Sequence, residues 1–123
     1  MATMLLKRGD VRTLTVSGLV DGNQAPAVFG VNDVLIWTAK RKFTDVDADA
    51  LFQKNSQNVG EILINTGSDT AVITLNPDDF PAGPIAKAIP FQWDLEYWPG
   101  GDDNLTTTLV SGDGSITPDV TLV

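Results

Sequence analysis

The stretch Ile89–Trp98, IPFQWDLEYW, most constrains what this chain can fold into. From Phe91 onward every second residue is large and apolar, and the residues between them are Gln92, Asp94 and Glu96. A period of two with aromatic residues on one side is typical of a β-strand that has one face on a core and one face in water. Burying such side chains stabilises a fold by about 1.5–3 kcal/mol each. We therefore predict a central strand here, against which the other strands pack.

Other short segments have β-like patterns, with turns between them roughly every 8–12 residues. The pattern predicts an all-β, antiparallel β-sandwich of about seven to eight short strands with little helix, in a single domain over residues 1–123; a small barrel is the alternative. Thr66–Asp69 is predicted to join two strands as a hairpin, Asn76–Gly83 to contain a short helical turn, and Ser111–Ser115 to form a turn. The further predicted strands are Met4–Lys7 (an edge strand or an arm), Asp10–Ser17, Asp33–Lys42, Ala50–Lys54, Glu61–Asn65, Ala71–Asn76, Leu105–Val110 and Ile116–Val123.

Composition restricts the possible functions. The 123 residues include no Cys and no His, and the formal net charge is −8. The chain therefore lacks disulfides, thiolate and imidazole ligands, and the usual general base. The negative charge opposes binding to nucleic acid or to an anionic membrane, and no apolar run approaches the ~20 residues of a membrane span. Met1–Arg8 contains no hydrophobic run of signal-peptide length, so we expect a protein made without secretory processing.

Two groups of acidic residues are candidate sites, and each has a plainer interpretation. Asp45–Asp49 resembles the start of a calcium-binding loop, but Ala50 and Ser56 stand where an EF-hand needs Gly and Glu, which favours a solvated acidic loop. Asp94 and Glu96 share one strand face about 6.5–7 Å apart. That separation overlaps the range of glycosidase carboxylate pairs, although alternating acids also suit any solvent-facing strand. We predict no catalytic residue, no metal ligand and no cofactor, and hence no enzyme.

The residues that we predict to contact other proteins lie at the termini, at one strand end and beside one turn. Trp98 lies on the opposite side of its strand from Trp93, where an exposed ring would either anchor a protein contact or cover a sheet edge. Lys40–Lys42 is either a solvated strand end or a contact for an acidic subunit. The extended termini would each add a strand to the open sheet edge of a neighbour. The candidate interface residues are Met4, Leu5, Leu6, Lys40, Arg41, Lys42, Trp98, Val120 and Leu122.

Five motifs together resemble a known family: KRGD, WTAKRKFTDVDADALFQK, NPDDF, WDLEYW and SGDGSITPDVT, at Lys7–Asp10, Trp37–Lys54, Asn76–Phe80, Trp93–Trp98 and Ser111–Thr121. Over about Leu5–Thr121 the chain resembles the N-terminal domain of the phage baseplate upper protein family, among the small virion proteins of tailed bacteriophages. The resemblance implies an immunoglobulin-like sandwich that serves as an assembly or adaptor module in the tail, baseplate or neck, and it supplies no catalytic or ligand residue.

On this basis we expect other phage structural proteins as partners, a homo-oligomer in the particle, and a location in the virion after assembly in the bacterial cytoplasm. Neither a nucleic acid nor a membrane is expected as a partner. Two alternatives stay open: a capsid decoration protein, and a carbohydrate-binding module that stacks sugars on Tyr97 and Trp98.

Overall fold

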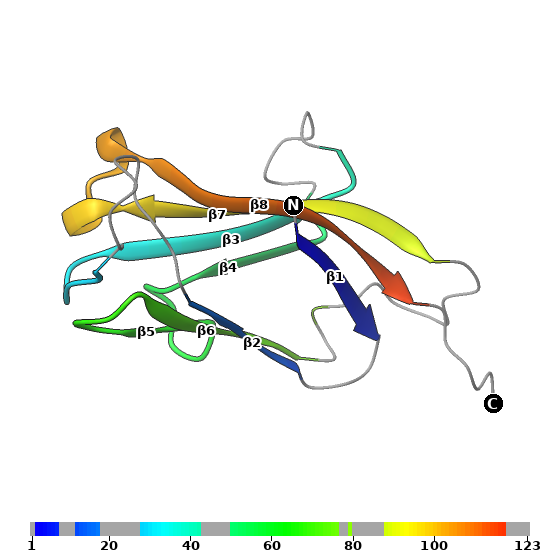
Figure 1. Cartoon of the computed structure of the whole chain (residues 1–123), viewed down its shortest axis with the longest axis horizontal. Helices are drawn as coiled ribbons and strands as arrows, with labels where there is room; N and C mark the ends of the chain where they lie inside the picture. Colours follow the sequence, from blue (N-terminus) through cyan, green and yellow to red (C-terminus); the bar gives the residue numbers. More distant parts are fainter. Residues whose placement is uncertain are drawn as a thin grey trace.

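A computed structural model describes residues 2–7, 12–17, 28–42, 50–76, 79 and 88–117. These residues form eight strands in two layers (Figure 1). The larger sheet has the order β1-β8-β7-β3-β4, and the smaller sheet has the order β2-β6-β5. The strands are β1 (Ala2–Lys7), β2 (Arg12–Val16), β3 (Val34–Lys40), β4 (Phe52–Asn55), β5 (Ile62–Asn65), β6 (Thr70–Leu75), β7 (Ile89–Trp98) and β8 (Thr107–Thr117), with 3₁₀ turns η3 (Pro99–Gly101) and η4 (Asp103–Leu105) between the last two.

The predicted all-β sandwich is confirmed, with one difference in how its strands pair. Within the described residues the two sheets are separate and each ends in two open edges, so the alternative of a closed barrel is wrong. The pairing is antiparallel except between β1 and β8, which run parallel. No helix in the described part of the chain has the length and hydropathy needed to cross a membrane.

Strand β7 lies in the middle of the larger sheet, as predicted, between β8 and β3. Trp93, one of its two tryptophans, is buried and lies directly across from Ala39 on β3 and Gly112 on β8. Small residues on both sides leave room for the indole ring, whose Nε1 donates a hydrogen bond to the carbonyl oxygen of Asp113 at 3.0 Å. Directly opposite pairs are the unit of sheet stabilisation, so this large-with-small arrangement fixes the register of three strands.

The core lies between the two sheets. Trp37 of β3 stacks on Phe52 of β4 at a ring-centroid distance of 5.9 Å, and Phe52 meets Phe91 of β7 edge-on at 6.1 Å. Ile73 and Leu75 of β6, both completely buried, cover this cluster from the smaller sheet. The burial of these apolar side chains between the two sheets is the main contribution to the stability of the fold.

The turn that the sequence predicts at Ser111–Ser115 is wrong, because β8 continues through it to Thr117. Gly112 and Gly114 are buried opposite Trp93 and Phe91, and Gly-Asp-Gly here makes space for aromatic rings instead of reversing the chain. The start of this strand also differs from the prediction, since Leu105 belongs to η4 and the strand begins at Thr107.

The remaining strand predictions hold with small changes in their ends. The hairpin of β5 and β6 is confirmed, and β1 is an edge strand of the larger sheet. Strand β3 is buried on both faces from Val34 to Ala39, not on one face as alternation suggested. After β6, Asp79 lies in a 3₁₀ turn and its carboxylate accepts a 2.6 Å hydrogen bond from the N–H of Asn76. The loop 43–49 and the last predicted strand beyond Thr117 lie outside the described residues.

Candidate functional site

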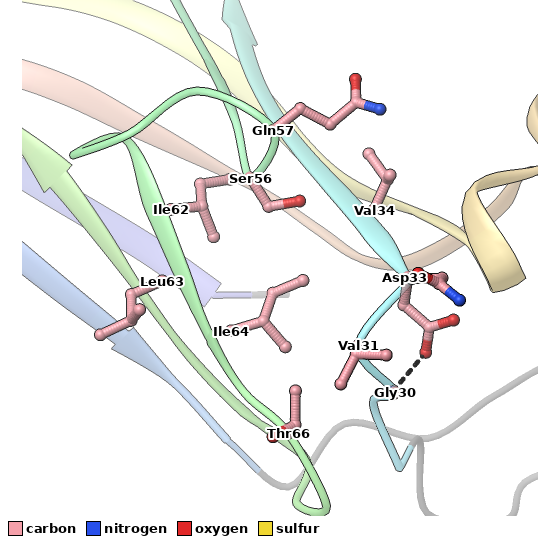
Figure 2. Close-up of a pocket in the computed structure, with 11 residues that line it drawn as sticks. Gly30, Val31, Asp33, Val34, Ser56, Gln57, Ile62, Leu63, Ile64 and Thr66 are labelled. Atoms are coloured by element: carbon pink, nitrogen blue, oxygen red, sulfur yellow. Dashed lines mark hydrogen bonds between the residues drawn. The ribbon is translucent and has the colours of Figure 1, made fainter.

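A cleft of about 400 Å³ opens between β5 and the segment that leads into β3 (Figure 2). One wall is formed by Ile62 and Ile64 of β5, and the other by Val31 and Val34. Figure 2 shows Ile64 and Val31 facing each other across it. Val31 is 83% exposed, although it is a large apolar residue. The cleft opens at the end of the sandwich, where β5 and β3 diverge, and polar side chains such as Asp33, Ser56 and Thr66 line it together with the apolar ones.

A second hollow of about 470 Å³ lies on the other side of β5. It is lined by Val59 in the turn after β4, by Leu63 of β5, and by Val72 and Thr74 on the outer face of β6. Leu63 borders both hollows and is 73% exposed, and Val59 is completely exposed. The edge of β5 is thus flanked by a hollow on each face: a mixed polar and apolar cleft beside Val31, and a mainly apolar hollow beside Val72.

The open edge of β5 carries main-chain groups that the fold does not use. The N–H of Thr74 donates to the carbonyl of Glu61 at 2.9 Å, so these two residues form a hydrogen-bonded pair. Such pairs alternate along an antiparallel ladder, and the next one is Leu63 with Val72. The N–H and C=O groups of Ile62 and Ile64 therefore point away from β6, and they make no hydrogen bond to any described residue.

The turn between β4 and β5 is held by its own polar side chains. The carboxylate of Glu61 accepts from the N–H of Asn55 at 2.9 Å and from the side chain of Asn58 at 3.3 Å. At its start, Ser56 bonds the main chain of Leu35 twice, through its own N–H and through its hydroxyl, each at 2.9 Å. These bonds attach the turn to β3, so the walls of both hollows are preorganised.

Asp33 fixes the opposite wall of the cleft. One carboxylate oxygen accepts from the N–H of Gly30 at 2.7 Å and from the hydroxyl of Tyr97 at 2.9 Å, and the other accepts from the N–H of Gly100 at 2.7 Å. Burial alone raises the pKa of Asp33, but these three hydrogen bonds lower it more, so its pKa lies below the ordinary 3.8. Asp33 is therefore an ionised clamp that joins the loop before β3 to the end of β7.

The residues that the sequence predicts to contact other proteins differ in how exposed they are in the structure. Leu6 is 1% exposed and belongs to the core of its own domain, so its predicted contact with another protein is wrong. The side chains of Met4 and Leu5, and the residues Val120 and Leu122, lie outside the described part. Lys40 is half-buried at the end of β3, and Arg41 and Lys42 are exposed beyond it. Trp98 lies at the other end of β3, opposite Val34.

Trp98 is half-buried, neither fully exposed nor fully covered, so its contact with another protein stays a prediction. Its indole N–H is buried and donates to no described residue. The hydroxyl of Tyr97 bonds Asp33, and its ring packs edge-on against Phe29 at 5.5 Å. Sugar stacking on these two half-buried rings stays an untested alternative.

The acidic candidates form no centre in the described part of the chain. Asp94 and Glu96 are half-buried on one face of β7, opposite Thr38 and Ile36 of β3. No group of three acidic side chains is placed to hold a metal ion among the residues with described positions. The calcium-like loop Asp45–Asp49 lies outside them.

Sequence reasoning missed the β5 edge. The run Ile62-Leu63-Ile64 identified a strand, and its unbroken apolar character was a signal that the outward residue, Leu63, lies on a surface able to bind another chain. No model of a known protein family matches this chain, and a search of curated proteins finds no similar sequence.

Proposed function

We propose that this protein is a structural bacteriophage virion protein, with an immunoglobulin-like sandwich that acts as an assembly or adaptor module in the tail, baseplate or neck. The motifs KRGD, NPDDF and WDLEYW support this proposal, because they carry the resemblance to the N-terminal domain of the phage baseplate upper protein family. Partners would be other structural proteins of the particle, and several copies would assemble there as a homo-oligomer.

The strand order is the observation that carries this proposal. The variable type of immunoglobulin sandwich has a G-F-C-C′ sheet packed on a sheet that contains B, E and D. The orders β8-β7-β3-β4 and β2-β6-β5 correspond to these two sheets, with β1 as an added parallel edge strand next to β8. This correspondence supports the immunoglobulin-like topology that the family resemblance implies.

Open edges support a role in assembly. Strands β1 and β4 end the larger sheet, and β2 and β5 end the smaller one. Unpaired strand edges are templates for the strands of other chains, and proteins that keep them usually have them covered in an assembly. The large exposed apolar residues near one of these edges also support a role in assembly; they are Val31, Val59 and Leu63.

Cryo-electron microscopy of intact phage particles tests the proposal. We expect density that fits this sandwich in a ring of copies at the tail tip, baseplate or neck. Density spread over the icosahedral shell would identify a decoration protein instead. Absence of the chain from purified particles, checked by peptide mass spectrometry against the major capsid protein as a control, would refute the proposal.

A further inference from the structure

We propose that the open edge of β5 binds an extended segment of a different structural protein, one with alternating apolar side chains and with Lys or Arg at its ends. This inference rests on the proposed function, because it names the kind of partner that the assembly module joins. The bound segment would become a fourth strand of the smaller sheet, next to β5.

Main-chain geometry provides the first argument. The N–H and C=O groups of Ile62 and Ile64 point outward from the sheet and make no hydrogen bond to any other described residue. An added strand would pair first with the groups of Ile64, which is half-buried, because Ile62 is only 5% exposed. Strand addition of this kind obtains affinity from main-chain bonds and selectivity from the pockets that receive alternate side chains.

The two hollows provide the second argument. Successive side chains of a strand point to opposite faces of its sheet. Along β5, one set would enter the cleft of about 400 Å³ beside Val31 and Ile64, and the other would enter the hollow of about 470 Å³ beside Leu63 and Val72. Both hollows lie along the same short edge strand. The hollow beside Leu63 and Val72 is mainly apolar and suits the apolar side chains of an alternating segment, whereas the cleft beside Val31 also offers polar groups to the side chains between them.

Charge determines the chemistry of the ends. Asp33 is the only charged residue among the described residues that line either hollow. Glu61 lies immediately before β5, and Asp69 lies in the turn immediately after it. No Lys or Arg borders the two hollows in the described part. Opposite charges at the rim of an interface speed association and select the partner, so a segment with basic ends fits and one with acidic ends is repelled.

Charge also argues against a second copy of this chain on the edge. Antiparallel pairing of β5 with itself would place Asp33, Glu61 and Asp69 of two chains, each with a net charge of −8, against one another. The chain does have an apolar segment with a basic end, Met4–Lys7, but it already forms β1, and Leu6 is buried in the core. Releasing Leu6 would cost about 1.5–3 kcal/mol.

The test uses purified protein and a library of capped nine-residue peptides. One set has two Lys at each end and all combinations of Val, Leu and Thr at the five central positions; the other set has Glu in place of Lys. We expect members of the Lys set to bind, with shifted and more protected amide signals of Ile62 and Ile64 by NMR, and the Glu counterparts to bind about tenfold more weakly or not at all.

Two variants assign the binding to the edge. Leu63→Lys changes an exposed residue of the strand, so the fold is retained, and it should weaken the best peptide by about tenfold or more, because Lys blocks an edge and repels the basic ends. Leu105→Lys is the matched control, since Leu105 is 56% exposed and lines neither hollow. Ile64→Pro removes an outward N–H that the sheet does not use, and should likewise abolish binding.

Three peptide-binding results would overturn the inference, and one result on the oligomeric state would do so as well. The three are no binding by any peptide of the Lys set, equal binding by the wild type and Leu63→Lys, or equal binding of the Glu set. A dimer in sedimentation equilibrium that Leu63→Lys dissociates would overturn it in favour of a second copy. Because the titration needs no phage particle, peptide binding without any copy in the virion would sustain the edge site while refuting the proposed location.

Discussion

Replacement of Asp33 by Asn tests whether one carboxylate joins the wall of the cleft to the end of β7. In Asp33→Asn the amide oxygen still accepts from Gly30 and Tyr97, but the amide NH₂ faces the N–H of Gly100, so one hydrogen bond is lost and two lose their ionic character. Hydrogen bonds to charged groups contribute about 1.5–3 kcal/mol each, and those to neutral groups about half of that.

Both glycine donors are exposed, and water replaces part of what is lost. We therefore expect a fall in the free energy of unfolding of about 1.5–2.5 kcal/mol at pH 7, which for a chain of this size is about 5–10 °C in Tm.

Urea denaturation followed by tryptophan fluorescence measures this change. The control is Asp103→Asn, which makes the same charge change at an exposed residue whose carboxylate accepts no hydrogen bond from a described residue, and it should alter stability by less than about 0.5 kcal/mol. If Asp33→Asn differs from this control by less than about 0.5 kcal/mol, the three bonds do not act as a clamp and the reasoning is wrong.

Three further outcomes are expected. Because folding lowers the pKa of Asp33, its contribution is complete above the ordinary value of 3.8 and is lost as the pH falls through the lower folded value, so the stability gap between wild type and Asp33→Asn should close below about pH 4 in urea titrations. Asp79→Ala removes the partner of the buried Lys54 ammonium, 2.8 Å away, and should destabilise the protein by about 2–3 kcal/mol, whereas Lys54→Met should cost less than half as much; equal losses would contradict the role of an uncompensated charge. An added Cβ at Gly101 would lie 3.0 Å from a backbone carbonyl oxygen, whereas one at Gly67 meets open space, and both residues have positive φ; in thermal unfolding Gly101→Ala should therefore lose more than the about 1–2 kcal/mol expected for Gly67→Ala.

The sequence predicted the fold class because β-strand alternation is a local signal. IPFQWDLEYW identified β7 as the centre, and the turn chemistry of Thr66–Asp69 identified the β5–β6 hairpin. The same local rules failed at Ser111–Ser115. Gly and Asp favour turns in isolation, but their meaning there depends on Trp93 and Phe91 across the strand, about twenty positions away in the chain.

The candidate site was less predictable than the fold. A strand pattern states which side chains share a face, but all strands offer the same main-chain groups, so the pattern does not reveal which strand ends a sheet. Leu63 therefore looked like an ordinary strand residue, and Leu6 like an available one, until the sheet order placed the first on an open edge and the second in the core.

By itself, the sequence determined the β-strand character of most segments, the negative net charge, and the absence of His and Cys, because each of these depends on residue identity and near neighbours alone. Tertiary structure decided which edges stay open, where the hollows beside β5 lie, and how Asp33 joins residues as far away as Gly100. These features depend on pairing and packing between distant segments, and the free energy of such contacts is not encoded in any one stretch of the chain.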